Sequence, residues 1–121
     1  MNYLGYMLAE KGLELEEAVA VLQKAVALEP DNGAYLDSLG WALYKTGKME
    51  DARKYLEKAA QKSGDDAVIL EHLGDVHQAM GDQEKARNAW EKAHKADPDA
   101  PGPKMKLEGS LSSGPNAPIM R

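Results

Sequence analysis

The sequence contains no cysteine and no phenylalanine among its 121 residues. Without cysteine there are no disulfides, no thiolate nucleophile and no cysteine-ligated zinc site. Acidic residues outnumber basic ones, 20 to 15, so the net charge of −5 has the wrong sign for coating a nucleic-acid backbone. Long apolar runs are also missing, because the longest, residues 18–22, is far shorter than the ~20 residues of a membrane helix. These absences argue against nucleic-acid binding and against direct insertion into a membrane.

Proline is scarce until the last part of the chain. Only Pro30 occurs before residue 98, whereas residues 101–121 contain four prolines, three glycines and three serines. This composition resists regular structure, so we predict a flexible, disordered tail over residues 101–121. The tail is net basic and the first hundred residues are net acidic. A basic tail could fold back onto an acidic body, but the composition favours a solvated extension.

The first hundred residues repeat themselves with a period of 34. Gly40 recurs as Gly74 and Gly47 recurs as Gly81, and the alanines at 52 and 59 recur at 86 and 93. A first copy starts near residue 1. It contains one extra residue, after which its second half aligns with the second halves of the other copies. The sequence therefore predicts three copies, over residues 1–32, 33–66 and 67–100.

Each copy has the pattern of two amphipathic helices separated by a glycine. Gly40 and Gly74 fall inside the first helix of their copies, where glycine costs ~1 kcal/mol relative to alanine. We therefore expect the two helices of a copy to cross closely at this position. The second glycine of each copy suits the left-handed residue that ends a helix. Asp82 suits the N-cap of the helix that follows, whereas Lys48 in the equivalent place does not.

The pattern of Leu-Gly at residues 39–40 and 73–74, followed by alanine, a large residue, alanine and proline, resembles the tetratricopeptide repeat (TPR). The resemblance covers residues 1–100 and implies an all-α, right-handed superhelical solenoid of three helix-turn-helix pairs. The segments NYLGYMLAEKGLELEEA and HLGDV are further similar to the C-terminal part of long bacterial TPR proteins, many of them lipoproteins or periplasmic. The compartment is left open between a periplasmic or membrane-anchored location, through a segment preceding residue 1, and the cytoplasm.

The resemblance also implies a concave groove lined by the first helix of each pair. Trp41 and Tyr44 are three residues apart and share one helix face, where they suit an apolar or basic segment of a partner. The alternative is that Trp41 packs between repeats. One variant of the family clamps a C-terminal carboxylate with Lys, Asn and Arg, but only Asn2 among the corresponding residues is of a suitable type. The groove-facing positions implied by the resemblance are Asn2, Tyr6, Asp37, Trp41, Tyr44, Lys45, Glu71, Asp75 and Gln78.

The sequence contains no constellation typical of catalysis or of cofactor binding. His72 and His77 are five residues apart, about 140° around a helix of 3.6 residues per turn, so they cannot share a metal ion. We expect His77 to pack in the interior and His72 to be solvated. There is no serine paired with a base and no glycine-rich phosphate loop. We therefore predict a protein that is not an enzyme and holds no metal or cofactor.

Two functions remain after these exclusions. The favoured one is a non-catalytic interaction module that binds a peptide or protein segment in the TPR groove. The alternative is a terminal cap or spacer of a longer TPR scaffold, which forms a homodimer through its apolar first helix at residues 3–8. Under this alternative the array continues before residue 1, and the polar last helix indicates that it ends near residue 98.

Overall fold

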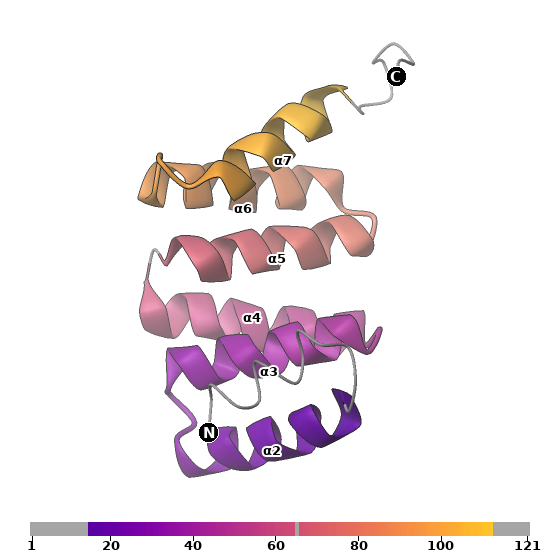
Figure 1. The fold of residues 1–121 in the computed structure, drawn as a ribbon, viewed down its shortest axis with the longest axis vertical. Coiled ribbons are helices and arrows are strands. Elements are labelled where there is room, and N and C mark those ends of the chain that lie inside the picture. Colours follow the sequence, from indigo (N-terminus) through magenta and orange to yellow (C-terminus); the bar gives the residue numbers. More distant parts are fainter. Residues whose placement is uncertain (1–14, 65, 113–121) are drawn as a thin grey trace. The chain divides into compact units, whose positions relative to one another are not determined.

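The computed structural model of the chain describes residues 15–64 and 66–112. The described residues form helices and contain no strand, which confirms the prediction of an all-α protein. The helices are α2 (Leu15–Leu28), α3 (Gly33–Lys45), α4 (Met49–Ser63), α5 (Ala67–Ala79), α6 (Gln83–Ala96) and α7 (Pro101–Ser112) (Figure 1). They belong to two compact units, residues 1–64 and 65–121.

In the first unit, α3 packs against both α2 and α4. The leucines that recur three and four residues apart on α3 point into this core, and Leu36 and Leu39 are completely buried. Leu22 of α2 and Leu56 of α4 are also completely buried. The amphipathic pattern of the sequence therefore places one apolar stripe of each helix in the interior, where most of the free energy of folding originates.

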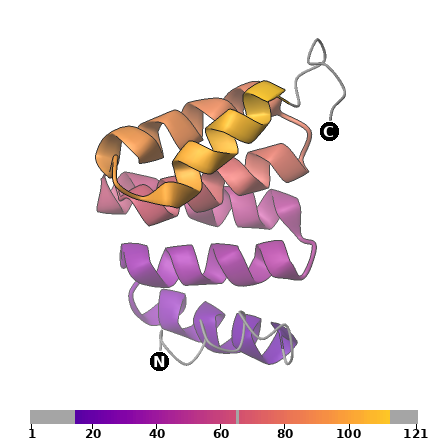
Figure 2. The same ribbon diagram turned by 45° about the horizontal axis from the view of Figure 1, so that its top comes forward.

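In the second unit, α5 packs against α6, and α6 packs against α7. Figures 1 and 2 show α7 crossing over α6 at an angle. Val76 of α5 is completely buried and Trp90 of α6 is 1% exposed. Trp90 is the largest side chain in the core of this unit, so much of the apolar burial between α5 and α6 depends on it.

The glycines inside the first helices mark close helix crossings, as predicted. A Cβ atom added at Gly40 would lie 2.6 Å from Cγ of Leu56, and one added at Gly74 would overlap the indole of Trp90. The second glycine of each pair ends a helical turn with a positive φ, 87° at Gly47 and 86° at Gly81. The repeated glycines therefore have two separate causes, close packing in one case and backbone conformation in the other.

The two equivalent turns differ in helix capping. The side chain of Asp82 accepts a hydrogen bond from the backbone N–H of Lys85, whereas Lys48 makes no side-chain cap. The backbone angles nevertheless match, with φ and ψ of −98° and 83° at Asp82 and −92° and 74° at Lys48. Both expectations for these positions are confirmed.

This match predicts opposite effects for two substitutions. Lys48→Asp should raise the free energy of unfolding by about 1 kcal/mol, because it supplies an N-cap acceptor to a backbone already in the right conformation. Asp82→Ala should lower it by about the same amount, since the cap is lost. Urea unfolding followed by circular dichroism measures both. A Lys48→Ala control separates capping from removal of the positive charge, and a gain equal to that of Lys48→Asp would contradict the capping explanation.

The expected flexibility of the tail is wrong for residues 101–112, which form α7. Pro101 stands at the first position of the helix, where proline costs nothing because the N–H is unpaired in any case. Pro103 lies in the same first turn and is completely buried. The prolines of this segment therefore begin a helix instead of preventing one. Residues 113–121 lie outside the described residues.

Candidate functional site

The face of α3 that was predicted to meet a partner carries an aromatic cluster, Trp41, Tyr44 and Lys45. The rings of Trp41 and Tyr44 are stacked, with centroids 4.8 Å apart and planes inclined by 19°. Nζ of Lys45 lies 5.3 Å from the centroid of the Trp41 ring, within the range of a cation–π contact. Trp41 and Tyr44 are half-buried, and Asp37 is half-buried one turn before Trp41. The cluster thus presents a flat, partly apolar surface next to a charge.

The corresponding face of α5 carries two carboxylates, Glu71 and Asp75, referred to below as the acidic pair. Both are held by one cation from α7. Nζ of Lys106 lies 2.6 Å from Oε2 of Glu71 and 2.9 Å from Oδ2 of Asp75. Trp90 of α6 donates a hydrogen bond from Nε1 to Oδ1 of Asp75 over 3.2 Å. Gln78, predicted to share this face, is exposed.

The charge on Lys106 is stable in this environment. Partial burial lowers the pKa of Lys106, but hydrogen bonds and the negative charges of Asp75 and Glu71 more than offset this effect. The pKa of Lys106 therefore lies above its ordinary value. Lys106 stays protonated at neutral pH, and the acidic pair keeps a cation between its carboxylates.

Other predicted features have different outcomes. Asn2, Tyr6 and the apolar first helix lie outside the described residues. His77 is buried, as expected, at 6% exposure. The expected solvation of His72 is wrong, because His72 is buried at 9% exposure. Ser38, which occupies the same position one repeat earlier, is buried as well. This position of the repeat is therefore an interior one, which the alignment of the two copies could have indicated.

The sequence analysis missed two residues of the acidic site, Lys106 and Trp90. Lys106 lies in the segment that the sequence predicts to be a flexible tail. Trp90 enters the repeat pattern only as its large residue, with no role in a site. Pro101 at the start of α7 is a local signal of a helix start, and the opposite charges of tail and body indicated an attraction between them. Together these signals favour a docked helix, although neither identifies Glu71 and Asp75 as its partners.

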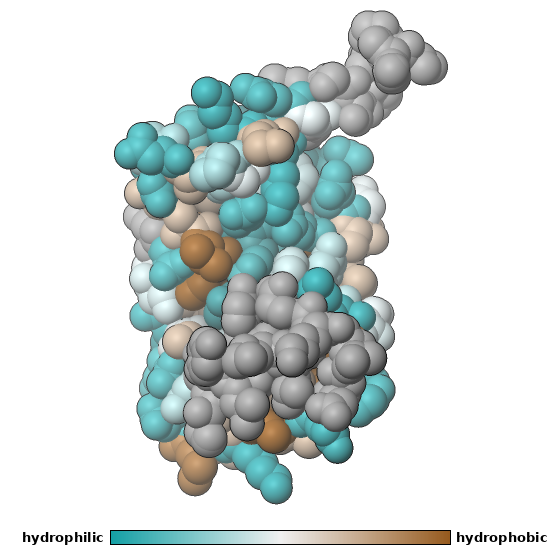
Figure 3. Space-filling view, in the orientation of Figure 1, coloured by the Kyte–Doolittle hydropathy of each residue, from teal (hydrophilic) through white to brown (hydrophobic). Residues whose placement is uncertain are grey.

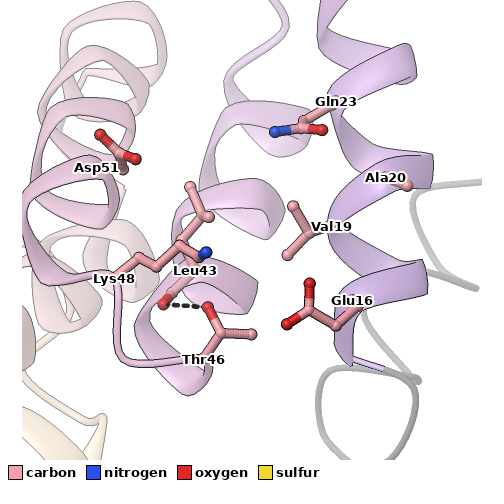
Figure 4. A pocket seen from close by; sticks show the side chains of 8 residues that line it. All are labelled: Glu16, Val19, Ala20, Gln23, Leu43, Thr46, Lys48 and Asp51. Carbon is pink, nitrogen blue, oxygen red and sulfur yellow. Dashed lines mark hydrogen bonds between the residues drawn. The ribbon is translucent and has the colours of Figure 1, made fainter.

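A hollow lies in the first unit, between α2 and the turn that joins α3 to α4 (Figure 4). It has a volume of about 380 Å³, and Figure 4 shows Val19 of α2 pointing toward Leu43 of α3. At its end the hydroxyl of Thr46 donates to the carbonyl oxygen of Leu43 over 2.8 Å. The charged residues that line the hollow are Glu16, Asp51 and Lys48. Because both signs of charge are present, the charge of the hollow does not select one kind of ligand. The lining residues are Glu16, Val19, Ala20, Gln23, Leu43, Thr46, Lys48 and Asp51.

The described part of the chain lacks two further kinds of feature. No helix among those residues is long and apolar enough to cross a membrane. Histidine and carboxylate side chains in the same ranges form no cluster that could ligate a metal ion. On the face drawn in Figure 3, hydrophilic residues predominate and hydrophobic ones form small separate patches.

Several solved structures share this fold. The first TPR of Spaghetti (RPAP3) bound to the HSP90 peptide SRMEEVD aligns with a TM-score of 0.85 and 16% identity, over 93% of this chain and 88% of that one. The Sgt2 TPR domain from Aspergillus fumigatus aligns with a TM-score of 0.83 and 22% identity, over 99% and 84%. PcrH, in complex with the chaperone binding region of PopD, aligns with a TM-score of 0.80 and 19% identity, over 91% of this chain and 87% of that one. Identities this low show the fold alone.

Sequence comparison supports the same family. A TPR repeat-containing protein of Pseudomonas aeruginosa, PA4667, is 45% identical over 49 residues, which are 40% of this chain and 8% of the relative. The chain thus spans less than a tenth of that relative's length. Two tetratricopeptide repeat models match residues 7–67 and 67–100, and the first alone covers half of the chain. The chain therefore belongs to the tetratricopeptide repeat family.

Proposed function

We propose that this chain is a non-catalytic interaction module that binds a peptide or protein segment through the first helices of its repeats. The observation that carries the proposal is the aromatic cluster on α3. Stacking fixes the orientation of Trp41 and Tyr44 before a partner arrives, so little side-chain entropy is lost on binding. Tryptophan and tyrosine are also the side chains that most often dominate binding energy at protein interfaces.

The chemistry of the cluster indicates the kind of segment that it would accept. The exposed parts of the two rings offer apolar area, and Asp37 adds a negative charge one turn before Trp41. A segment with an apolar side chain and a basic neighbour would complement both.

The structural neighbours are consistent with this proposal. The RPAP3 domain is bound to an HSP90 peptide and PcrH to a region of PopD, so the fold accommodates peptide segments in those proteins. Recognition of a C-terminal carboxylate is not part of the proposal for this chain. Ser38, Val68 and His72 occupy positions where that mode requires cationic or amide side chains, and two of these three residues are buried.

The proposal predicts that Trp41→Ala combined with Tyr44→Ala abolishes partner capture. We expect at least a tenfold loss of affinity, because truncation removes two clustered aromatic contacts. Affinity capture from a bacterial lysate followed by mass spectrometry compares the double variant with the wild type. A Tyr55→Ala variant, which removes an aromatic ring from the second helix α4, serves as the matched control.

Unchanged helicity in circular dichroism must accompany the loss, because an unfolded variant would lose partners for a trivial reason. Equal capture by the wild type and the double variant would refute a role for the aromatic cluster. The homodimer alternative has its own measurement: light scattering should show an increase in mass with concentration only if the chain self-associates.

A further inference from the structure

Helix α7 meets α5 at the acidic pair. Lys106 reaches both carboxylates, and α7 also packs against α6. Gly102 lies so close to Glu71 that an added Cβ atom would overlap the carboxylate. The acidic pair is therefore already occupied by a segment of the chain that supplies a lysine and a close backbone approach.

The sequence of α7 makes this occupant weak as a helix. Gly109 costs about 1 kcal/mol relative to alanine within this helix. A helix of 12 residues is marginal in isolation even with a favourable composition, so α7 depends on its docking. Of its apolar side chains, Pro103 is completely buried and Leu107 is half-buried, whereas Met105 keeps 66% of its surface exposed.

Helix α6 carries two polar side chains at positions that are apolar in the first repeat. Nε of Arg87 and Nδ1 of His94 are buried and have no hydrogen-bond partner among the described residues. The repeat places them at the positions of Val19 and Val26 on α2, the helix that packs against α3 as α6 packs against α7. A buried polar atom without a partner costs free energy in the folded chain. The last repeat thus carries two polar atoms where the first repeat is apolar.

We propose that α7 is a displaceable occupant of the acidic pair, and that a basic segment of a partner protein takes its place. The partner's lysine or arginine would lie between Glu71 and Asp75 where Lys106 lies now. This inference rests on the proposed interaction function and specifies one surface of it.

The test uses the full chain and a synthetic probe of known sequence. The probe is a fluorescein-labelled peptide, PGPKMKLEGSLS, which copies residues 101–112. Fluorescence anisotropy measures its binding to the wild type, to Lys106→Ala and to Lys104→Ala. Lys104 is exposed on the same helix, so Lys104→Ala removes the same charge without touching the acidic pair.

We expect the peptide to bind Lys106→Ala at least tenfold more tightly than it binds the wild type or Lys104→Ala. In the last two proteins the chain's own α7 competes at a high effective concentration, whereas in Lys106→Ala it competes poorly. Adding Glu71→Gln and Asp75→Asn to Lys106→Ala should remove the gain. A peptide in which the second lysine, the counterpart of Lys106, is replaced by alanine should likewise show no tighter binding to Lys106→Ala than to the wild type.

Equal affinity for all three proteins, or no binding to Lys106→Ala at millimolar peptide, would overturn the proposal and make α7 a permanent cap. Amide hydrogen exchange gives a second measurement: residues 104–109 should exchange faster in Lys106→Ala than in Lys104→Ala, and identical protection would also overturn it. Neither assay involves a cellular partner or the aromatic cluster. Failure here therefore differs from failure of the capture experiment with Trp41→Ala and Tyr44→Ala.

Discussion

Gly74→Ala is expected to lower the free energy of unfolding by about 2 kcal/mol, although alanine is the better helix former. The added Cβ atom would overlap the indole of Trp90, which is buried and hydrogen-bonded to Asp75. A rigid ring system cannot rotate away without losing its packing, so the overlap is relieved by moving α5 and α6 apart. Urea unfolding followed by circular dichroism measures the loss.

Two other glycines provide matched controls. Gly109 lies in α7 with nothing within 4 Å of an added Cβ atom, so Gly109→Ala should raise helix stability by up to about 1 kcal/mol. At Gly40 the added atom meets Leu56, whose branched end can change rotamer, so Gly40→Ala should cost less than Gly74→Ala. Equal effects at all three positions would show that close helix packing does not explain the repeated glycines.

These glycines show which parts of the fold could be predicted from the sequence. A close crossing requires a residue without a side chain at a fixed place in each copy, and therefore a 34-residue spacing appears directly in the sequence. The helix-ending glycines and the Asp82 cap follow from local backbone rules in the same way. The shared face of Trp41 and Tyr44 was predictable because helical geometry alone brings residues three apart together.

The acidic site depended on tertiary contacts that no local rule contains. Lys106 lies 35 residues after Glu71 and 31 after Asp75, so nothing in the sequence near Lys106 identifies its partners. The glycines and prolines of residues 101–112 argue against a helix when they are only counted. Their positions matter more than their number, because Pro101 begins α7 and Gly102 allows a close approach to Glu71. The proline and glycine content of residues 101–112 therefore predicted a flexible tail, whereas the place of each proline and glycine in the segment is compatible with a helix.

Trp90→Ala is expected to have the largest effect of any single substitution considered, about 3–5 kcal/mol, since it removes the largest buried side chain of the second unit. It also removes the indole donor of Asp75, while the hydrogen bond from Nζ of Lys106 to that carboxylate stays in place. Differential scanning calorimetry and urea unfolding measure the loss. Trp41 stays in place and its fluorescence reports on the first unit separately.

A double-mutant cycle tests whether Gly74 and Trp90 act as one contact. If the cost of Gly74→Ala comes from overlap with the indole, this substitution should cost little in a Trp90→Ala background, where the new methyl group partly fills the cavity. The coupling energy should then be at least 1 kcal/mol, and an additive result would refute the overlap. The equivalent cycle at Gly40 and Leu56 should give a coupling energy of the same sign but smaller size. In that repeat the added Cβ atom meets the side chain of Leu56, which is more flexible than an indole ring.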